Sequence, residues 1–181
     1  GIAVDSTGNV YVVDSQNSRV QKFSSSGTFL AKWGSQGAAD GQFQWLQGIA
    51  VDSSGNVFVT DANRIQKFSS SGAFLAKWGS YGSGDGQFSN PQGIAVDSSG
   101  NVYVVDSGNN RVQKFSASGA FLSKWGSYGT GDGLLNGPQG IAANGSGNVY
   151  VVDTQNHRIQ KFSPAWVTVA VDHVPPSAPT D

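Results

Sequence analysis

Aspartate and arginine recur along the chain in pairs whose spacing allows each pair to meet across one strand connection. The pairs are Asp14 with Arg19, Asp61 with Arg64, Asp106 with Arg111, and Asp153 with Arg158. In each pair the aspartate ends an apolar run and the arginine opens the next, so the two groups can form charge-assisted hydrogen bonds. We predict that the pairs are structural, because an active site needs dissimilar groups that converge, and these groups are the same in every copy.

A second set of aspartates precedes tight turns. Asp5, Asp52 and Asp97 stand before Ser-Thr-Gly-Asn or Ser-Ser-Gly-Asn, where an aspartate side chain can cap the turn. Calcium binding is the alternative reading of these carboxylates. The turns lack the acidic density of a calcium loop, and the fourth copy has Asn144 at this position. We therefore predict no metal site.

The other charges also follow a repeating pattern. All 11 basic residues fall at three repeated positions, and of the 12 aspartates only Asp172 and Asp181 stand outside the pattern. Because no copy carries a charged group of its own, the sequence predicts no catalytic residues, no cofactor and no enzymatic activity. The net charge of -1 gives no basic surface, so nucleic acid is not an expected partner.

Several further kinds of site lack the residues they need. The chain has no cysteine and two histidines, His157 and His173. No Gly-x-Ser-x-Gly motif marks a serine nucleophile. No apolar run reaches the roughly 18 residues of a membrane helix, so no membrane insertion is expected.

The charges sit on an internal repeat. The string Gly-Ile-Ala begins at residues 1, 48, 93 and 140. The second period is two residues shorter than the others because Asp61 and Arg64 stand closer together than their counterparts. A repeat of this length indicates tandem copies of one supersecondary unit.

Each copy contains four β-like runs separated by turn residues, in the third copy 93–97, 101–106, 111–115 and 121–126. The second run is apolar on both faces, which predicts burial on both sides, and we expect burial to fall from the inner to the outer strands. Four short strands in about 45 residues are typical of a propeller blade. We predict an all-β propeller of four-stranded antiparallel blades at about 1–47, 48–92, 93–139 and 140–171, and a proline-rich linker at 172–181.

The segment from Gly93 to Phe115, GIAVDSSGNVYVVDSGNNRVQKF, closely resembles the NHL repeat. The triplet that gives the repeat its name is loose here and reads Asn110-Arg111-Val112. The resemblance covers about residues 1–163 in four copies. It implies a propeller, commonly of six blades, that binds protein or RNA and occasionally catalyses a reaction. Lyases of the family hold a metal through several histidines, and two histidines do not supply such a set.

Four copies are fewer than six, which leaves three readings open. The chain is a piece of a longer array, a true four-bladed ring, or half of a ring completed by a second copy. The first copy lacks the Pro-Gln that precedes Gly93 and Gly140, so we expect truncation upstream, and the different run at 166–171 suggests an end cap. The proline-rich tail resembles the lead into β-sandwich modules of secreted microbial proteins. We therefore expect neighbouring domains of a larger polypeptide and a secreted or cell-surface location.

One end of the predicted propeller is the candidate recognition face. Loops between the second and third strands and connections between blades share this end, and the copies differ most there. The candidate residues are Gln16, Trp45, Tyr81, Asn110, Tyr128 and His157. For the two tyrosines, packing between blades remains the alternative.

Aromatic residues among glycine and polar residues suit contact with a protein or a glycan. The predicted function is a non-catalytic extracellular binding or assembly module, with self-association through the open edges of an incomplete ring. The alternative is a fragment of a metal-dependent lyase or hydrolase propeller whose catalytic residues lie in other blades.

Overall fold

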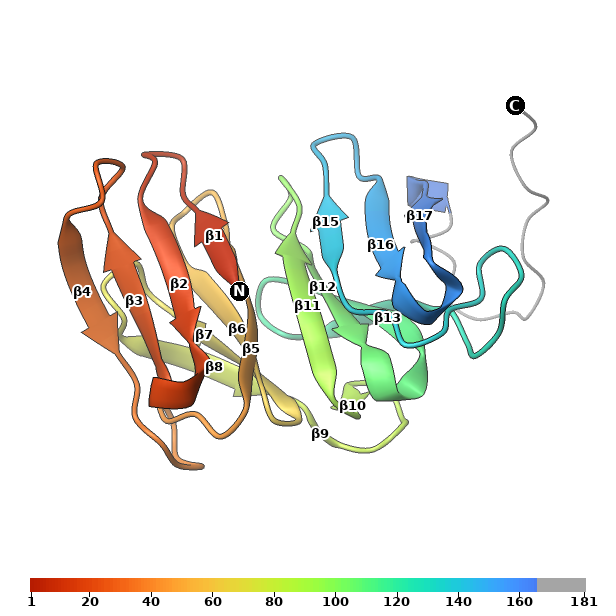
Figure 1. The fold of residues 1–181 in the computed structure, drawn as a ribbon, viewed down its shortest axis with the longest axis horizontal. Coiled ribbons are helices and arrows are strands. Elements are labelled where there is room, and N and C mark those ends of the chain that lie inside the picture. Colours follow the sequence, from red (N-terminus) through yellow and green to blue (C-terminus); the bar gives the residue numbers. More distant parts are fainter. Residues whose placement is uncertain (166–181) are drawn as a thin grey trace.

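The computed structural model describes residues 1–165, which fold into β-sheets that stand side by side as blades (Figure 1). Three sheets have four antiparallel strands in sequence order, and the described part of the last sheet has three. Blade 1 contains β1 (Ile2–Val4), β2 (Val10–Asp14), β3 (Arg19–Phe23) and β4 (Phe29–Trp33). Blade 2 contains β5 (Leu46–Val51), β6 (Val57–Asp61), β7 (Arg64–Phe68) and β8 (Phe74–Trp78).

The two later blades repeat this order. Blade 3 contains β11 (Pro91–Val96), β12 (Val102–Asp106), β13 (Arg111–Phe115) and β14 (Phe121–Trp125). Blade 4 contains β15 (Ile141–Ala143), β16 (Val149–Asp153) and β17 (Arg158–Phe162). The predicted all-β propeller is confirmed. The predicted end cap at 166–171, the linker at 172–181 and His173 lie outside the described residues.

A short 3-10 turn joins the second and third strands of three blades. These turns are η1 (Ser15–Asn17), η2 (Ser107–Asn109) and η3 (Thr154–Asn156). Each ends on a residue with left-handed backbone, at Ser18, Asn110 and His157. Blade 2 has only Ala62 and Asn63 between its strands, and Ala62 takes the positive φ of 52°. The shorter second period of the sequence is thus a tighter turn, and the strand register beyond it is unchanged.

Neighbouring blades enclose the core between them. The innermost strands β1, β5, β11 and β15 lie next to one another in this order. We call the side of a blade that faces the following blade its trailing face, and the side that faces the preceding blade its leading face. Between blades 1 and 2 the core joins Tyr11, Val13 and Val20 of the trailing face to Val59 and Phe68 of the leading face. Equivalent cores lie between blades 2 and 3 and between blades 3 and 4.

Burial is deepest in the second strand of each sheet. The strands β6 and β12 are buried at every residue, as their apolar character on both faces predicts. The innermost strands β5 and β11 are only partly buried, so the predicted fall from inner to outer strands is wrong. The reason is that β6 and β12 each have a paired strand on both edges and a packed blade on each face, whereas the innermost strand is an edge strand of its own sheet.

Connecting segments run from the outer strand of one blade to the inner strand of the next. Between blades 2 and 3 this segment forms the parallel pair β9 (Ser80–Tyr81) and β10 (Gln87–Phe88), at the lower edge of Figure 1. The other two segments form single parallel bridges, Gln36 with Phe43 and Tyr128 with Leu135. Each segment inserts one fully buried side chain into the core between blades, namely Phe43, Phe88 or Leu135. No helix among the described residues is long and apolar enough to cross a membrane.

Candidate functional site

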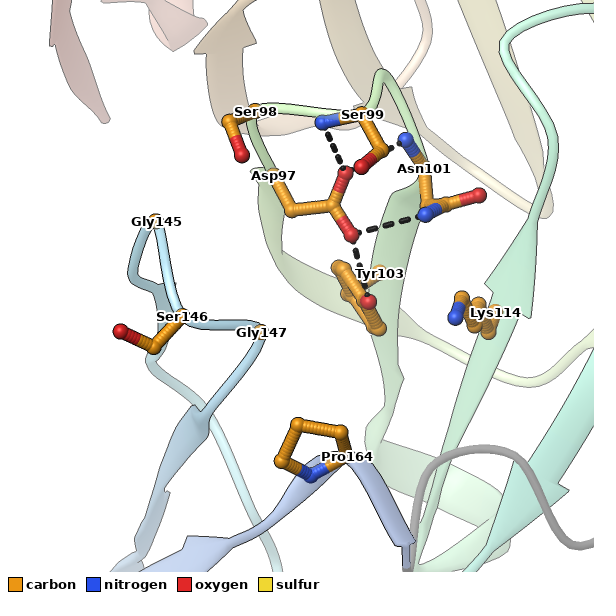
Figure 2. A pocket seen from close by; sticks show the side chains of 10 residues that line it. All are labelled: Asp97, Ser98, Ser99, Asn101, Tyr103, Lys114, Gly145, Ser146, Gly147 and Pro164. Carbon is orange, nitrogen blue, oxygen red and sulfur yellow. Dashed lines mark hydrogen bonds between the residues drawn. The ribbon is translucent and has the colours of Figure 1, made fainter.

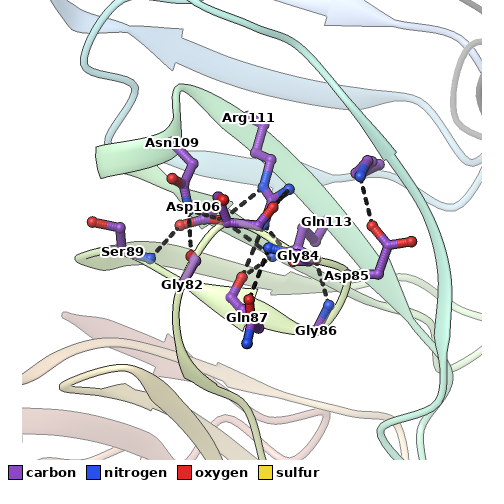
Figure 3. Close-up of polar contacts among 12 residues, drawn as sticks. Gly82, Gly84, Asp85, Gly86, Gln87, Ser89, Asp106, Asn109, Arg111 and Gln113 are labelled. Carbon is purple, nitrogen blue, oxygen red and sulfur yellow. Dashed lines mark hydrogen bonds and ion pairs between the residues drawn. The ribbon is translucent and has the colours of Figure 1, made fainter.

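The Asp–Arg pair of blade 3 lies at the centre of a hydrogen-bonded cluster (Figure 3). Arg111 Nε donates to Asp106 Oδ2 at 2.7 Å, and Asn109 and Gln113 donate side-chain N–H groups to the same oxygen. The other oxygen, Asp106 Oδ1, accepts from the backbone N–H of Ser89 at 2.7 Å. Since Asp106 is fully buried, these four donors supply the partners that water would otherwise provide.

The same arginine also fixes the segment that arrives from blade 2. Arg111 donates through its terminal nitrogens to the carbonyl oxygens of Ser83, Gly84 and Gln87, at 2.7 to 2.9 Å. Gln113 donates to Gln87 O at 2.6 Å and accepts from Gly86 N at 3.0 Å. The cluster therefore attaches the connecting segment of the preceding blade to the blade that follows it.

Equivalent clusters occur in blades 2 and 4, and a reduced one in blade 1. Arg64 pairs with Asp61 at 2.9 Å and donates to three carbonyls of the segment 38–42. Arg158 pairs with Asp153 at 2.8 Å and donates to the carbonyls of Gly131 and Leu134. In blade 1 Arg19 pairs with Asp14 at 2.7 Å, and among the described residues no carbonyl accepts from it. All four predicted pairs thus lie within ion-pair distance.

Hydrogen bonding lowers the pKa of two of these carboxylates, Asp14 and Asp153. Burial alone would raise the pKa of Asp153, but hydrogen bonds from Asn156, the Asn136 amide, Arg158 and Gln160 outweigh it and lower the pKa. For Asp14, hydrogen bonds from Arg19 and Asn17 are the main cause of a lowered pKa. A carboxylate with these partners is a poor proton acceptor at neutral pH. The clusters are therefore suited to holding the blades together.

At the opposite end of the blades, a polar cavity of about 310 Å³ lies between the turns of blades 3 and 4 (Figure 2). Its lining includes Asp97, Asn101, Tyr103 and Lys114 of blade 3, and Ser146 of blade 4. Asp97 accepts the turn amides of Ser99 and Asn101 as the sequence predicts, and also the Tyr103 hydroxyl at 2.8 Å.

The ionisable groups of this cavity are Asp97, Tyr103 and Lys114. Burial would raise the pKa of Asp97, but hydrogen bonds from Asn101 and other turn groups lower it. Burial raises the pKa of Tyr103, and its hydrogen bond to Asp97 raises it further. Lys22, Lys67 and Lys114 each hold the ammonium 4.9 to 5.4 Å from the centre of an aromatic ring of the second strand. Lys22 and Lys67 also donate to the carbonyls of Ser70 and Ala117 in the next blade, and among the described residues no carbonyl accepts from Lys114. Sequence reasoning missed this cavity, although the pairing of Tyr103 with Lys114 on neighbouring strands is readable from the repeat.

The predicted recognition face lies at the end that carries the 3-10 turns and the connecting segments. Its three aromatic side chains are strongly exposed, Trp45 at 72%, Tyr81 at 74% and Tyr128 at 73%. Packing of the two tyrosines between blades is therefore wrong, because Phe88 and Leu135 take that place. Gln16 and His157 are exposed in the turns, and Asn110 is half-buried and accepts from Gly137 N at 2.8 Å.

The described residues contain no group of three or more histidine, aspartate or glutamate side chains placed to hold a metal ion. His157, the single histidine in residues 1–165, stands alone on a turn. The recognition face offers a set of aromatic rings beside polar groups. The connecting segments at this end also carry Asp40, Asp85 and Asp132, which form ion pairs with Lys77, Lys124 and Arg158.

The stacked four-stranded blades and the segments that link them define the class of protein as a β-propeller. Within that class, residues 1–23, 88–115 and 135–162 match the NHL repeat, so the chain contains NHL repeats and the resemblance seen in its sequence is confirmed. The second copy is not matched over 48–87, although its sheet has the same strand pairing. A comparison with curated protein sequences finds no significant relative.

Solved structures with this fold include enzymes. A streptogramin B lyase structure is 18% identical with a TM-score of 0.68, over 91% of this chain and 51% of its own. A catalytically inactive histidine-to-alanine variant of virginiamycin B lyase from Staphylococcus aureus, solved with quinupristin, is 17% identical with a TM-score of 0.63, over 90% and 54%. A Bacteroides thetaiotaomicron protein of unknown function is 18% identical with a TM-score of 0.69, over 90% and 46%. The chain spans about half the length of these structures.

The lyases overturn one sequence-based prediction. Absence of enzymatic activity was inferred from charges that repeat in every copy, and the finding that lyases share this fold contradicts that inference. The physical reason is that a propeller supplies a repeated scaffold, while a few side chains on its loops are sufficient for chemistry. The Asp–Arg clusters recur in every blade and belong to the scaffold. They therefore do not indicate whether side chains on the loops catalyse a reaction.

Proposed function

We propose that this NHL propeller segment binds a neutral glycan through its loop face, with Trp45, Tyr81 and Tyr128 as the contacting aromatic residues. The observation that carries the proposal is the exposure of these three rings, each at nearly three quarters of its surface. Large aromatic side chains are normally buried for their apolar area, and where they are exposed they mark contact surfaces.

The chemistry around the rings favours a neutral ligand. Tyr81 and Tyr128 are both flanked by serine and glycine, and Trp45 lies between Gln44 and Leu46. The nearby Asp–Arg pairs use their charge internally, in ion pairs and in bonds to backbone carbonyls. Sugar rings present C–H groups that stack on an aromatic face, and hydroxyls that exchange hydrogen bonds with serine and glutamine side chains. A secreted or cell-surface location accords with such a ligand.

The test is binding of neutral polysaccharides and oligosaccharides, measured by affinity electrophoresis and calorimetry. We expect a variant with Trp45→Ala, Tyr81→Ala and Tyr128→Ala together to lose binding while its free energy of unfolding changes by less than about 1.5 kcal/mol, since exposed substitutions cost about 0.5 kcal/mol or less each. Leu75→Ala, at an exposed leucine of the outer strand β8, is the matched control. Binding of a protein in place of a glycan, or glycan binding that survives the triple substitution, would refute the proposal.

Lyase activity is the second candidate, and the shared fold of the streptogramin B and virginiamycin B lyases supports it. One of those structures contains quinupristin and owes its inactivity to the loss of a histidine. Incubation with quinupristin, followed by mass spectrometry of the products, tests this candidate. His157→Ser is the matched variant, because Ser18 occupies the same turn position in blade 1. An unchanged substrate after prolonged incubation would argue against lyase activity.

A further inference from the structure

The turn between the first two strands of each sheet has the same kind of sequence in every blade except blade 4. Blades 1, 2 and 3 have Asp-Ser-Thr-Gly or Asp-Ser-Ser-Gly, beginning at Asp5, Asp52 and Asp97. Blade 4 has Asn144 in place of the aspartate, followed by Gly145. An asparagine before glycine is prone to deamidation, because glycine has no Cβ to hinder attack of its backbone nitrogen on the asparagine side chain. The turn of blade 4 thus lacks a carboxylate and has the sequence that can form one.

The side chain of Asn144 is held in the same way as the aspartates. Asn144 Oδ1 accepts the backbone N–H groups of Ser146 and Asn148, each at 3.0 Å. Asp97 Oδ1 accepts the two equivalent N–H groups at 2.9 Å. Two donors on the side-chain oxygen of Asn144 draw electrons from Cγ, and they stabilise the negative charge that forms on Oδ1 when a nucleophile adds to Cγ. The turn therefore activates the carbon atom at which deamidation begins.

The nucleophile in this reaction is the backbone nitrogen of Gly145. Gly145 is exposed, and a Cβ at this residue would meet no atom within 4 Å. Among residues 1–165, no acceptor is hydrogen-bonded to the Gly145 N–H group. The chain has a second Asn-Gly pair, Asn136 with Gly137, and there the glycine N–H donates to Asn110 Oδ1 at 2.8 Å. The structure therefore leaves one glycine nitrogen accessible and holds the other in a hydrogen bond.

The donors that would bind a new carboxylate are already present in blade 4. In blade 3, Asp97 Oδ2 accepts from the side-chain amide of the turn and from the Tyr103 hydroxyl, both at 2.8 Å. Blade 4 has the same two donors, Asn148 and Tyr150. Within the part of the chain that the structure describes, neither side chain donates a hydrogen bond. The physical reason is that Asn144 has an NH2 group where Asp97 has its second oxygen, and an NH2 group does not accept.

We propose that Asn144 is a site of spontaneous deamidation, and that the aspartate it forms completes the turn of blade 4. Gly145 N loses its proton and forms a bond to Asn144 Cγ, and the bond from Cγ to Nδ2 breaks, so that ammonia leaves and a cyclic imide remains. Water then adds to the imide at Cγ, the bond from Cγ to Gly145 N breaks, and this nitrogen takes up a proton. One water is consumed and one ammonia is released, without an oxidant or a reductant.

The turn also favours one of the two products. Water that adds at Cγ gives aspartate, and water that adds at the backbone carbonyl carbon of residue 144 gives isoaspartate. Asn144 Oδ1 accepts two N–H groups, whereas the backbone oxygen of Asn144 accepts one, from Gly147 at 3.0 Å. Addition at Cγ is therefore favoured, and aspartate is the main product. Each conversion adds one negative charge beside the polar cavity, whose lining includes Gly145 and Ser146 (Figure 2).

The test is incubation of the folded chain at mildly alkaline pH, followed by peptide mass spectrometry. The fragmentation must locate the gain of one dalton at residue 136 or 144 and must distinguish aspartate from isoaspartate. In the folded chain we expect Asn144 to react about 10-fold or more faster than Asn136, whose glycine N–H is hydrogen-bonded. In concentrated urea the two pairs should react at similar rates, because unfolding removes that hydrogen bond. Equal rates in the folded chain, an intact Asn144 or isoaspartate as the main product would overturn the proposal.

Gly145→Ser is the matched variant, because the turns of blades 1, 2 and 3 have serine at this position. We expect it to slow the reaction of Asn144 by about 10-fold or more, since a Cβ restricts the backbone at the attacking nitrogen.

Asn144→Asp serves as the reference for the product. Its melting temperature should exceed that of the fresh wild type, and the incubated wild type should approach it as the reaction proceeds. Tyr150→Phe should lower the melting temperature of the Asn144→Asp protein more than that of the fresh wild type, because only the carboxylate accepts from the hydroxyl. An Asn144→Asp protein that melts no higher than the wild type would contradict the proposed completion of the turn.

Discussion

Blade 3 and blade 1 have nearly the same sequence and very different surroundings. Blade 3 has a blade on each side, and its Asp106 and Phe115 are fully buried. Within residues 1–165, blade 1 has a neighbour on its trailing side only, and the equivalent Asp14 and Phe23 are half-buried. Strand pairing is the same in both sheets. The contribution of a residue to the stability of this protein therefore depends mainly on contacts with the neighbouring blade. Contacts within its own sheet matter less, as expected of a repeat protein.

The largest expected effect is at the buried phenylalanine. Phe115→Ala should cost about 3–5 kcal/mol of unfolding free energy, because Phe115 packs against Trp78, Phe88 and Phe121 and its loss leaves a cavity. Phe23→Ala should cost less than half as much. Urea unfolding at low protein concentration measures both. Equal losses from the two substitutions would contradict the comparison.

The next effect is at the ion pair. Asp106→Ala should cost about 3 kcal/mol, because it leaves Arg111 buried without its carboxylate, although three carbonyls still accept from the guanidinium. Asp14→Ala should cost clearly less, since water reaches both Asp14 and Arg19. Thermal unfolding of the two variants in parallel provides the measurement. A larger loss of stability from Asp14→Ala than from Asp106→Ala would contradict the expectation that the more buried ion pair contributes more.

A smaller effect, dependent on pH, is expected at the turn of blade 3. Asp97→Asn gives blade 3 the residue that blade 4 has at Asn144, and should cost about 1 kcal/mol at pH 7 because an amide nitrogen does not accept the Tyr103 hydroxyl. Asp97 has a folded pKa below its unfolded value of about 3.9, so its contribution is present above about pH 4 and is lost as the pH falls through the folded pKa.

The measurement for Asp97→Asn is the melting temperature of wild type and variant between pH 7 and pH 2. The two curves should converge in acid. A difference that stays constant over this range would show that the carboxylate charge at residue 97 contributes nothing.

The smallest effect is expected at an exposed turn. His157→Ser should change stability by no more than about 0.5 kcal/mol, because Ser18 adopts the same left-handed backbone in blade 1 and His157 is exposed. Chemical denaturation checks this directly. A loss above 1 kcal/mol would mean that the histidine side chain has a structural contact that the turn geometry does not require.

The sequence predicts the strands and the Asp–Arg pairs because both repeat with fixed spacing and depend on contacts within one blade. It does not predict what else Arg111 binds. Its further partners are backbone carbonyls of Ser83, Gly84 and Gln87, and a carbonyl leaves no trace in residue type. The sequence likewise does not predict whether Tyr81 and Tyr128 are exposed or packed between blades. A short connecting segment has no periodicity that separates its exposed residues from its buried ones.

The similarity of the interfaces also affects how the chain folds. Any trailing face fits any leading face, so blade 1 can in principle dock on blade 3 or blade 4 before blade 2 is in place. The connecting segments reduce the risk of wrong docking, because each is short and keeps two consecutive blades close together. Phe43 and Phe88 in these segments also pack into the core between those two blades. The order of the blades is thus specified by the tethers between them, and lengthening a connecting segment should slow folding and increase misassembly more than it lowers equilibrium stability.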